Sequence, residues 1–156
     1  EVTGVPPPRG QPVDTSRVEW IRMGTTVATN ALLEREGART ALLITKGFRD
    51  LLHIGNQARP DIFDLAVQCP GVLYETVVEI DERVRLEKPE DAVPPPDAKR
   101  FKGLTGETVL VEKAPDPALV RAQLEEVKAK GIDSVAVVLM HAYTYTAHEE
   151  MIGDLA

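Results

Sequence analysis

A glycine and two threonines precede a predicted helix in the segment MGTTVATNALLEREG, residues 23–37. The first backbone N–H groups of a helix have no partner within the helix, and the helix dipole places partial positive charge there. This position therefore favours a phosphate or a carboxylate. Gly24, Thr25 and Thr26, followed by Asn30, are candidates for such a site. The alternative is that the two threonines only cap the helix.

Two further polar segments follow predicted strands. Lys46 and Arg49 come after the strand at 40–45, and His141 comes after the strand at 134–140. In open α/β sheets, ligands bind outside the carboxyl ends of the strands, so these side chains are candidates for contacting a substrate or a phosphate. The alternatives are that the two cations are solvated charges at a helix start and that His141 is a hydrogen-bonded core histidine.

An irregular stretch, GNQARPDIFDL at residues 55–65, is dense in polar side chains, as binding loops often are. Its Asp61 and Asp64 either cap a short turn or, with an outside partner, hold Mg²⁺, which binds one or two carboxylates and several waters. The sequence contains no His/Cys cluster with zinc spacing and no GxxxxGK, GxGxxG or GxSxG loop. The residues alone therefore indicate an anion-binding edge of a sheet, without a specific reaction.

The elements that must position these residues follow from hydrophobic periodicity and from helix-end signals. Asp116 predicts a helix start, Pro117 fits its first turn, and Gly131 predicts its end. The apolar run at 134–140 is typical of a strand buried on both faces. The predicted elements are strands at 19–23, 40–45, 76–86, 107–112 and 134–140, with helices at 26–36 (ended by Gly37), 48–53, 117–130 and 148–156.

This order predicts an α/β sheet with an inserted antiparallel hairpin. The hairpin pairs the alternating strand at 76–86, expected to be half-exposed and antiparallel, with the strand at 107–112. Prolines and glycines predict a linker or surface loop at 1–16. Four prolines among charges predict a mobile loop at 87–103.

Composition excludes several classes of partner. The formal charge of −7 argues against nucleic acid, which requires a basic face. No apolar run reaches the roughly 20 residues that span a bilayer, and no secretory signal opens the sequence. The single cysteine fits a reducing compartment. We therefore expect a cytoplasmic protein that binds neither nucleic acid nor membrane, and we expect the chain to be a segment of a longer polypeptide.

The stretch IRMGTTVATNALLEREGARTALLITKGFRDLLHIGNQARPDIFDL, residues 21–65, resembles the signature region of the hydantoinase A and 5-oxoprolinase family. LYETVVEIDERV at 73–84 and SVAVVLMHAYTYTAHE at 134–149 resemble its eukaryotic ATP-dependent 5-oxoprolinase branch. The resemblance implies that 17–156 is part of the family's amino-terminal domain, which is similar to the actin, sugar-kinase and Hsp70 nucleotide-binding fold.

The resemblance also implies a reaction. Enzymes of this branch use ATP, Mg²⁺ and K⁺ to open 5-oxo-L-proline to L-glutamate, with release of ADP and phosphate, in the γ-glutamyl cycle of glutathione. The parent protein is then a cyclic amide hydrolase that works as a homo-oligomer. The family's first phosphate loop, an Asp-Arg-Gly-Gly-Thr-Phe-Thr type of turn, has no match here. We therefore expect the chain alone to be inactive and to depend on the rest of its polypeptide.

Position in the family motif suggests a role for five residues. Thr25 and Thr26 are assigned to a phosphate or a substrate carboxylate, Asn30 to their support, Arg59 to an anion, and Asp61 to a metal ion or an orienting hydrogen bond. One alternative function is a subunit of a hydantoinase A type enzyme or of an ATP-dependent ketone carboxylase. A second is a non-catalytic actin-like assembly module.

Overall fold

The computed structural model of the chain describes residues 19–20, 22, 24–56, 63, 65–66, 71–88 and 97–156. The chain divides into two compact units, Glu1–Glu36 and Gly37–Ala156. The predicted linker at 1–16 lies outside the described residues.

The amino-terminal unit contains the helix α1 (Val27–Glu34). The sequence prediction that Gly37 ends this helix is wrong, because Arg35 already adopts the left-handed conformation, with φ of 57°. The N–H groups of Arg35 and Glu36 both donate to the carbonyl of Ala31 and close the helix there. The predicted strand at 19–23 is absent at its described positions, residues 19, 20 and 22, which pair with no described strand.

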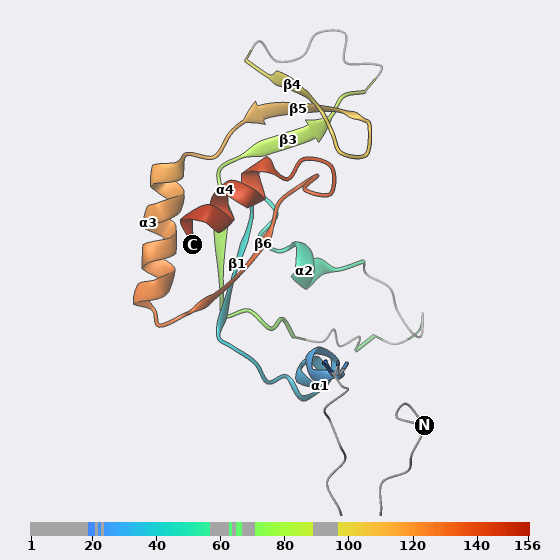
Figure 1. Cartoon of the computed structure of the whole chain (residues 1–156), viewed down its shortest axis with the longest axis vertical. Helices are drawn as coiled ribbons and strands as arrows, with labels where there is room; N and C mark the ends of the chain where they lie inside the picture. The colour runs from blue at the N-terminus through green and yellow to red at the C-terminus, as the bar shows by residue number, and fades with distance from the viewer. Residues whose placement is uncertain are drawn as a thin grey trace, which may run out of the picture. The chain divides into compact units, whose positions relative to one another are not determined.

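The carboxyl-terminal unit is built on a parallel sheet. Strands β1 (Thr40–Thr45), β2 (Thr76–Ile80) and β6 (Ser134–Val138) lie in the order β2-β1-β6 (Figure 1). The apolar run from Ala41 to Ile44 makes β1 the central strand, and all four side chains are at most 2% exposed. The prediction of a buried strand here is confirmed. β6, expected to be buried on both faces, is an edge strand of the described sheet, and Val138 is 44% exposed.

Helices α3 (Pro117–Ala129) and α4 (Ala147–Leu155) cover one face of this sheet, as Figure 1 shows. α3 begins as predicted, because the Asp116 carboxylate accepts a hydrogen bond from the Ala118 N–H at 2.9 Å. The short helix α2 (Leu51–Ile54) follows β1. The buried core between the sheet and the two helices consists of Ala41, Leu43, Ile80, Val120, Val127, Ile132, Leu139 and Ile152.

The single strand predicted at 76–86 is in fact two strands in two sheets. β2 pairs in parallel with β1, whereas β3 (Arg83–Leu86) is antiparallel. The break comes at Glu82, whose N–H donates to the carbonyl of Ile80 at 2.8 Å and whose side chain is buried. One apolar stripe thus serves two cores, since Ile80 packs in the first and Val84 in the second.

The predicted hairpin is a three-stranded antiparallel sheet. β5 (Thr108–Lys113) lies between β3 and β4 (Lys99–Lys102). β4 falls inside the segment at 87–103 that we expected to be a mobile loop, so that expectation is wrong for residues 99–102. Residues 89–96 of the same segment lie outside the described residues. The structure therefore confirms a mixed α/β chain with an antiparallel insertion.

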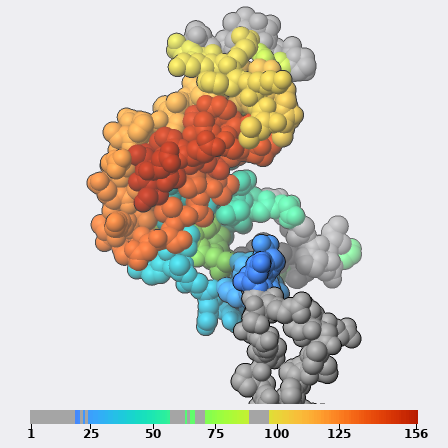
Figure 2. All heavy atoms as spheres, in the orientation of Figure 1, coloured from blue at the N-terminus to red at the C-terminus, as the bar shows by residue number. Residues whose placement is uncertain are grey.

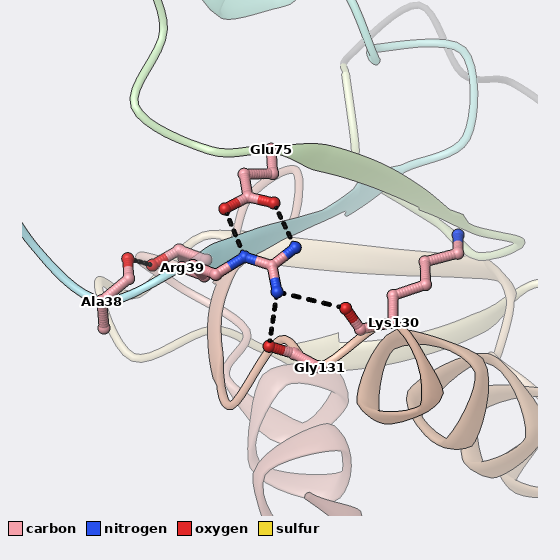
Figure 3. Close-up of polar contacts among 6 residues, drawn as sticks. Ala38, Arg39, Glu75, Lys130 and Gly131 are labelled. Carbon is pink, nitrogen blue, oxygen red and sulfur yellow. Dashed lines mark hydrogen bonds and ion pairs between the residues drawn. The ribbon is translucent and has the colours of Figure 1, made fainter.

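At the amino ends of the strands, Arg39 joins three segments (Figure 3). Its Nε and Nη2 each donate to the carboxylate of Glu75 at 2.7 Å. Its Nη1 donates to the carbonyls of Lys130 and Gly131, at 3.3 and 3.0 Å. These carbonyls lie at the carboxyl end of α3, where they have no partner within the helix. Arg39 thus ties the start of β1 to the start of β2 and to the end of α3.

This arrangement predicts a pH-dependent stability. The hydrogen bond from Arg39 lowers the pKa of Glu75 below its usual value. A carboxyl with a lowered folded-state pKa stabilises the fold above its unfolded pKa, and that stabilisation is lost as the pH falls through the folded pKa. We expect Arg39→Met to lower the melting temperature slightly at neutral pH, because both side chains are exposed, and less at about pH 3. Thermal unfolding at both pH values tests this, and an equal loss at both would assign the effect to the Lys130 and Gly131 contacts instead.

The turn between β4 and β5 docks against the segment after β6, where Figure 2 shows the yellow and orange-red parts of the surface in contact. The Leu104 N–H donates to the carbonyl of Thr144 at 2.9 Å, and the Thr105 hydroxyl donates to the Thr144 hydroxyl at 2.7 Å. A Cβ on Gly103 would lie 2.0 Å from Thr144 Oγ1. A larger residue at this position therefore requires Thr144 or its neighbours to shift.

We expect Gly103→Ala to lower the free energy of unfolding by about 1 to 3 kcal/mol, as overpacking does. The matched control is Gly37→Ala, where an added Cβ meets nothing within 4 Å. Chemical denaturation of both variants measures the difference. Equal stability of the two variants would show that the turn adjusts freely.

Candidate functional site

The carboxyl ends of β1 and β2 carry two of the predicted site residues. Lys46 directly follows β1, and its Nζ lies 3.9 Å from Asp81 Oδ1, beyond the end of β2. The next residue, Gly47, has a φ of 92°, and its N–H donates to Glu79 Oε1 at 2.7 Å. Arg49 is exposed and lies 4.0 Å from Asp50. Both predicted cations therefore lie near carboxylates in this structure.

The cations around Asp81 affect its ionisation. The hydrogen bond from Lys113 lowers the pKa of Asp81, and the charges of Lys113 and Lys46 act in the same direction. Arg83 completes the cluster, since its Nη2 donates to the carbonyl of Lys46 at 2.9 Å and its guanidinium lies 5.3 Å from the centre of the Phe48 ring. This edge of the sheet is a network of exposed ion pairs.

His141 begins the turn that follows β6. It has a left-handed φ of 63°, and its carbonyl accepts hydrogen bonds from the N–H groups of Thr144 and Tyr145. Its ring is half-buried and lies 6.1 Å from that of Tyr143, edge to face. The alternative that His141 is a core histidine is therefore wrong, and the backbone of this residue shapes the turn.

A buried polar network lies at the same ends of the strands. The Thr45 hydroxyl donates to Glu82 Oε1, while Thr45 Oγ1 accepts from the Met140 N–H at 3.0 Å. His148 Nδ1 lies 2.9 Å from Glu82 Oε2. The Glu82 side chain is 0% exposed and that of His148 is 8% exposed. The network thus joins the end of β1, the β2–β3 connection, the turn after β6 and the start of α4.

Aromatic packing completes this network. The ring of Tyr145 meets the His148 ring edge to face, at 5.1 Å between centroids and 88° between planes. The ring of Phe101 in β4 also packs against Tyr145, with 5.3 Å between the two ring centroids. Burial raises the pKa of the Tyr145 hydroxyl.

Sequence analysis missed Glu82 and His148, although each carries a local signal. Glu82 shares the two-residue period of Ile80 and Val84, so it belongs to the apolar face of an extended segment. His148 precedes Ile152 by four residues and therefore shares its helix face. A charged or titratable residue on an apolar face is the feature that indicates a buried network.

Residues Gly24, Thr25, Thr26 and Asn30 lie in the amino-terminal unit and are exposed. Thr26 is the N-cap residue of α1, but its side chain makes no capping hydrogen bond. The Asn30 N–H donates to the carbonyl of Thr26 at 2.9 Å, as in any helix. The simple capping role considered for Thr26 is thus not what the structure shows, and its hydroxyl is available to a ligand.

Arg59 and Asp61 lie outside the described residues. Within the described ranges, no group of three or more His, Cys, Asp or Glu residues is placed to hold a metal ion. Among the helices that the structure describes, none has the length and apolar character needed to cross a bilayer.

The sequence model described as "Hydantoinase/oxoprolinase N-terminal region" matches residues 7–156. The chain is 53% identical to 5-oxoprolinase 1 of Arabidopsis thaliana over 100% of its length, and 48% identical to 5-oxoprolinase of Saccharomyces cerevisiae over 96% of its length. It is 28% identical to the acetophenone carboxylase gamma subunit of Aromatoleum aromaticum over 89% of its length.

The chain spans 12% of the length of the two 5-oxoprolinases and 18% of that of the carboxylase subunit. No solved structure gives a significant match.

Proposed function

The chain belongs to the hydantoinase/oxoprolinase family, as part of its N-terminal region, and from this premise we propose that its parent protein is an ATP-dependent 5-oxoprolinase. The parent would hydrolyse 5-oxo-L-proline to L-glutamate while cleaving ATP to ADP and phosphate, in the γ-glutamyl cycle of glutathione. The observation that carries this proposal is the difference in identity, 53% to a plant 5-oxoprolinase against 28% to a carboxylase subunit.

The chemistry requires activation of a poor electrophile. The carbonyl carbon of a lactam resists attack by water, and transfer of a phosphoryl group to its oxygen makes that carbon reactive. A protein that performs this reaction must bind the phosphates and place the carbonyl in line with them. We propose that the parallel sheet with its helices is part of an actin-like nucleotide-binding module that does so.

The start of α1 fits a phosphate or a substrate carboxylate. The Thr26 hydroxyl makes no capping bond, and the residues from Gly24 to Thr26 are exposed in front of the helix dipole. Thr25 and Thr26 would donate to the anion, with Asn30 supporting them. Arg59, Lys46, Arg49 and His141 remain proposed contacts for substrate or phosphate.

We propose that the parent uses Mg²⁺ and K⁺ with ATP. Asp61 stays the proposed contact to Mg²⁺. We further propose that the parent is a cytoplasmic homo-oligomer, that the small molecule 5-oxo-L-proline is its substrate, and that this chain acts only together with the rest of its polypeptide.

A substrate panel tests the assignment. ATP hydrolysis by the purified parent should rise with 5-oxo-L-proline and remain at background with hydantoin or acetophenone. The second candidate is a hydantoinase A type enzyme or an ATP-dependent ketone carboxylase, and the similarity to a carboxylase subunit supports it. ATP hydrolysis that rises only with hydantoin or with the ketone would favour this candidate. If none of these compounds stimulates ATP hydrolysis, the result would favour a non-catalytic assembly module.

The chain alone should bind ATP weakly and release no ADP, because the phosphate loop typical of the family has no match in this sequence. Isothermal titration of the isolated chain with ATP measures this. Micromolar binding would contradict the expectation.

A further inference from the structure

The buried pair of Glu82 and His148 orients the imidazole ring, because His148 Nδ1 lies 2.9 Å from Glu82 Oε2. Thr45 Oγ1 accepts from the Met140 N–H, so its own proton points toward Glu82 Oε1. Glu82 Oε2 then receives its hydrogen bond from His148 Nδ1. A carboxylate beside Nδ1 favours the imidazole tautomer that donates from Nδ1. In that tautomer Nε2 is the nitrogen that can accept a proton.

Nε2 of His148 is the atom that the network leaves accessible. No described side-chain nitrogen or oxygen is both fully buried and without a hydrogen-bond partner, and the contacts of His148 are those to Glu82 and Tyr145. The small exposed area of this residue, 7%, therefore includes Nε2. A histidine kept only to join two segments would not need an accessible acceptor nitrogen at this edge of the sheet.

We propose that His148 is a proton acceptor for the ring-opening reaction and that Glu82, held by Thr45, is its positioning residue. The network follows β1 and β2, and in open α/β sheets the carboxyl ends of the strands face the ligand. A carboxylate that orients a histidine and fixes its tautomer is the arrangement that general base catalysis uses. The inference rests on the function proposed above.

In the proposed step, the oxygen of a water molecule bonds to the activated carbonyl carbon and one proton of that water passes to Nε2. The imidazolium returns the proton to the ring nitrogen as the carbon–nitrogen bond breaks. The histidine is thereby regenerated, and the opened ring carries an acyl phosphate on its new carboxyl carbon. A second water then takes up the phosphoryl group, which releases inorganic phosphate and leaves the free carboxylate of glutamate. The Glu82 carboxylate beside Nδ1 would stabilise the imidazolium.

His148→Asn in the full-length protein separates this role from a structural one. The amide nitrogen of asparagine takes the place of Nδ1 and keeps the hydrogen bond to Glu82, whereas nothing replaces Nε2. We expect a 10²- to 10⁴-fold loss of kcat with little change in melting temperature, and loss of the acidic limb of the pH profile of kcat/KM. The matched control is His53→Asn, an exposed histidine on α2, which should leave the rate unchanged.

Glu82→Gln tests the positioning role. A glutamine amide donates to Nδ1 and so moves the imidazole proton to Nε2, where it blocks acceptance of another. We expect kcat to fall while KM stays nearly constant. Turnover within threefold of wild type in both variants, with an unchanged pH profile, would overturn the inference while leaving the proposed function intact. A wild-type protein without 5-oxoproline-dependent turnover would instead overturn the proposed function.

If His148→Asn fails to fold, labelling of the wild-type parent gives an independent answer. Diethyl pyrocarbonate acylates an accessible, unprotonated imidazole nitrogen. We expect a label on His148, detected by peptide mass spectrometry, and slower labelling in the presence of 5-oxo-L-proline and ATP. A label on the exposed His53 with none on His148, or labelling of His148 that the substrates leave unchanged, would overturn the inference.

Discussion

Glu82→Ala is expected to lower the free energy of unfolding of the carboxyl-terminal unit by about 3 to 5 kcal/mol. The Glu82 side chain is fully buried, it accepts a hydrogen bond from Thr45, and it lies 2.9 Å from His148 Nδ1. Its removal leaves two buried polar side chains without their hydrogen-bond partner. The free energy of unfolding then falls by the desolvation penalty of those unsatisfied groups. Amide hydrogen exchange of β1 and α4, measured by mass spectrometry in the parent protein, reports the loss locally.

Two variants make this result interpretable. Glu125→Ala replaces an exposed glutamate on α3 and should change stability by less than about 0.5 kcal/mol. Glu82→Gln keeps both hydrogen-bonding positions filled and should cost clearly less than Glu82→Ala. If the amides of β1 and α4 exchange as slowly in Glu82→Ala as in the wild type, the network does not hold these segments together.

Thr26→Val is expected to reduce the turnover of the parent roughly a hundredfold, or about 3 kcal/mol of transition-state stabilisation. Valine has almost the shape of threonine and lacks the hydroxyl that we assign to an anion. Because the Thr26 side chain makes no capping hydrogen bond, the melting temperature should stay near that of wild type. The turnover and the thermal unfolding of the same preparation are the two measurements.

Thr29→Val is the matched control. It makes the same substitution at another exposed threonine of α1, to which we assign no contact with the anion. It should retain wild-type turnover. Normal turnover with a lowered melting temperature in Thr26→Val would mean that the threonine caps the helix in the parent and that the anion site lies elsewhere.

Local signals predicted the elements whose causes are local. Asp116 and Pro117 start α3 as expected, because a cap acts on N–H groups only two or three residues away. The apolar run in β1 predicted a buried strand, and the structure buries it as the central strand of the sheet. The order of the predicted elements was enough to predict an α/β fold with an antiparallel insertion.

Distant contacts explain what the sequence did not predict. The alternation at 76–86 continues through Glu82, but the strand breaks there because Glu82 bonds to Thr45 and His148, which are 37 and 66 residues away in the sequence. α1 ends at Arg35 and not at Gly37 as predicted. The hydrophobic periodicity of the sequence does not indicate which of these two residues ends the helix. The missed strand β4 has a different origin, since it pairs locally with β5 but lies in the proline-rich segment that we expected to be a loop.

The candidate site was predicted in part. Lys46 does follow β1 at the carboxyl end of the sheet, although it lies 3.9 Å from Asp81. His141 was selected because it follows an apolar strand, whereas the buried histidine is His148, later in the chain and on the face of Ile152. The strand-end rule led to the edge of the sheet where the buried network lies, whereas only the helix face shared with Ile152 indicates that His148 is buried.

The central claim is that the parent protein couples ATP cleavage to lactam opening. The most direct measurement is the ratio of ADP to L-glutamate formed from 5-oxo-L-proline by the purified parent. We expect one ADP for each glutamate, with neither product formed when 5-oxo-L-proline or ATP is left out. ADP released without glutamate, or glutamate formed without ATP, would contradict the account.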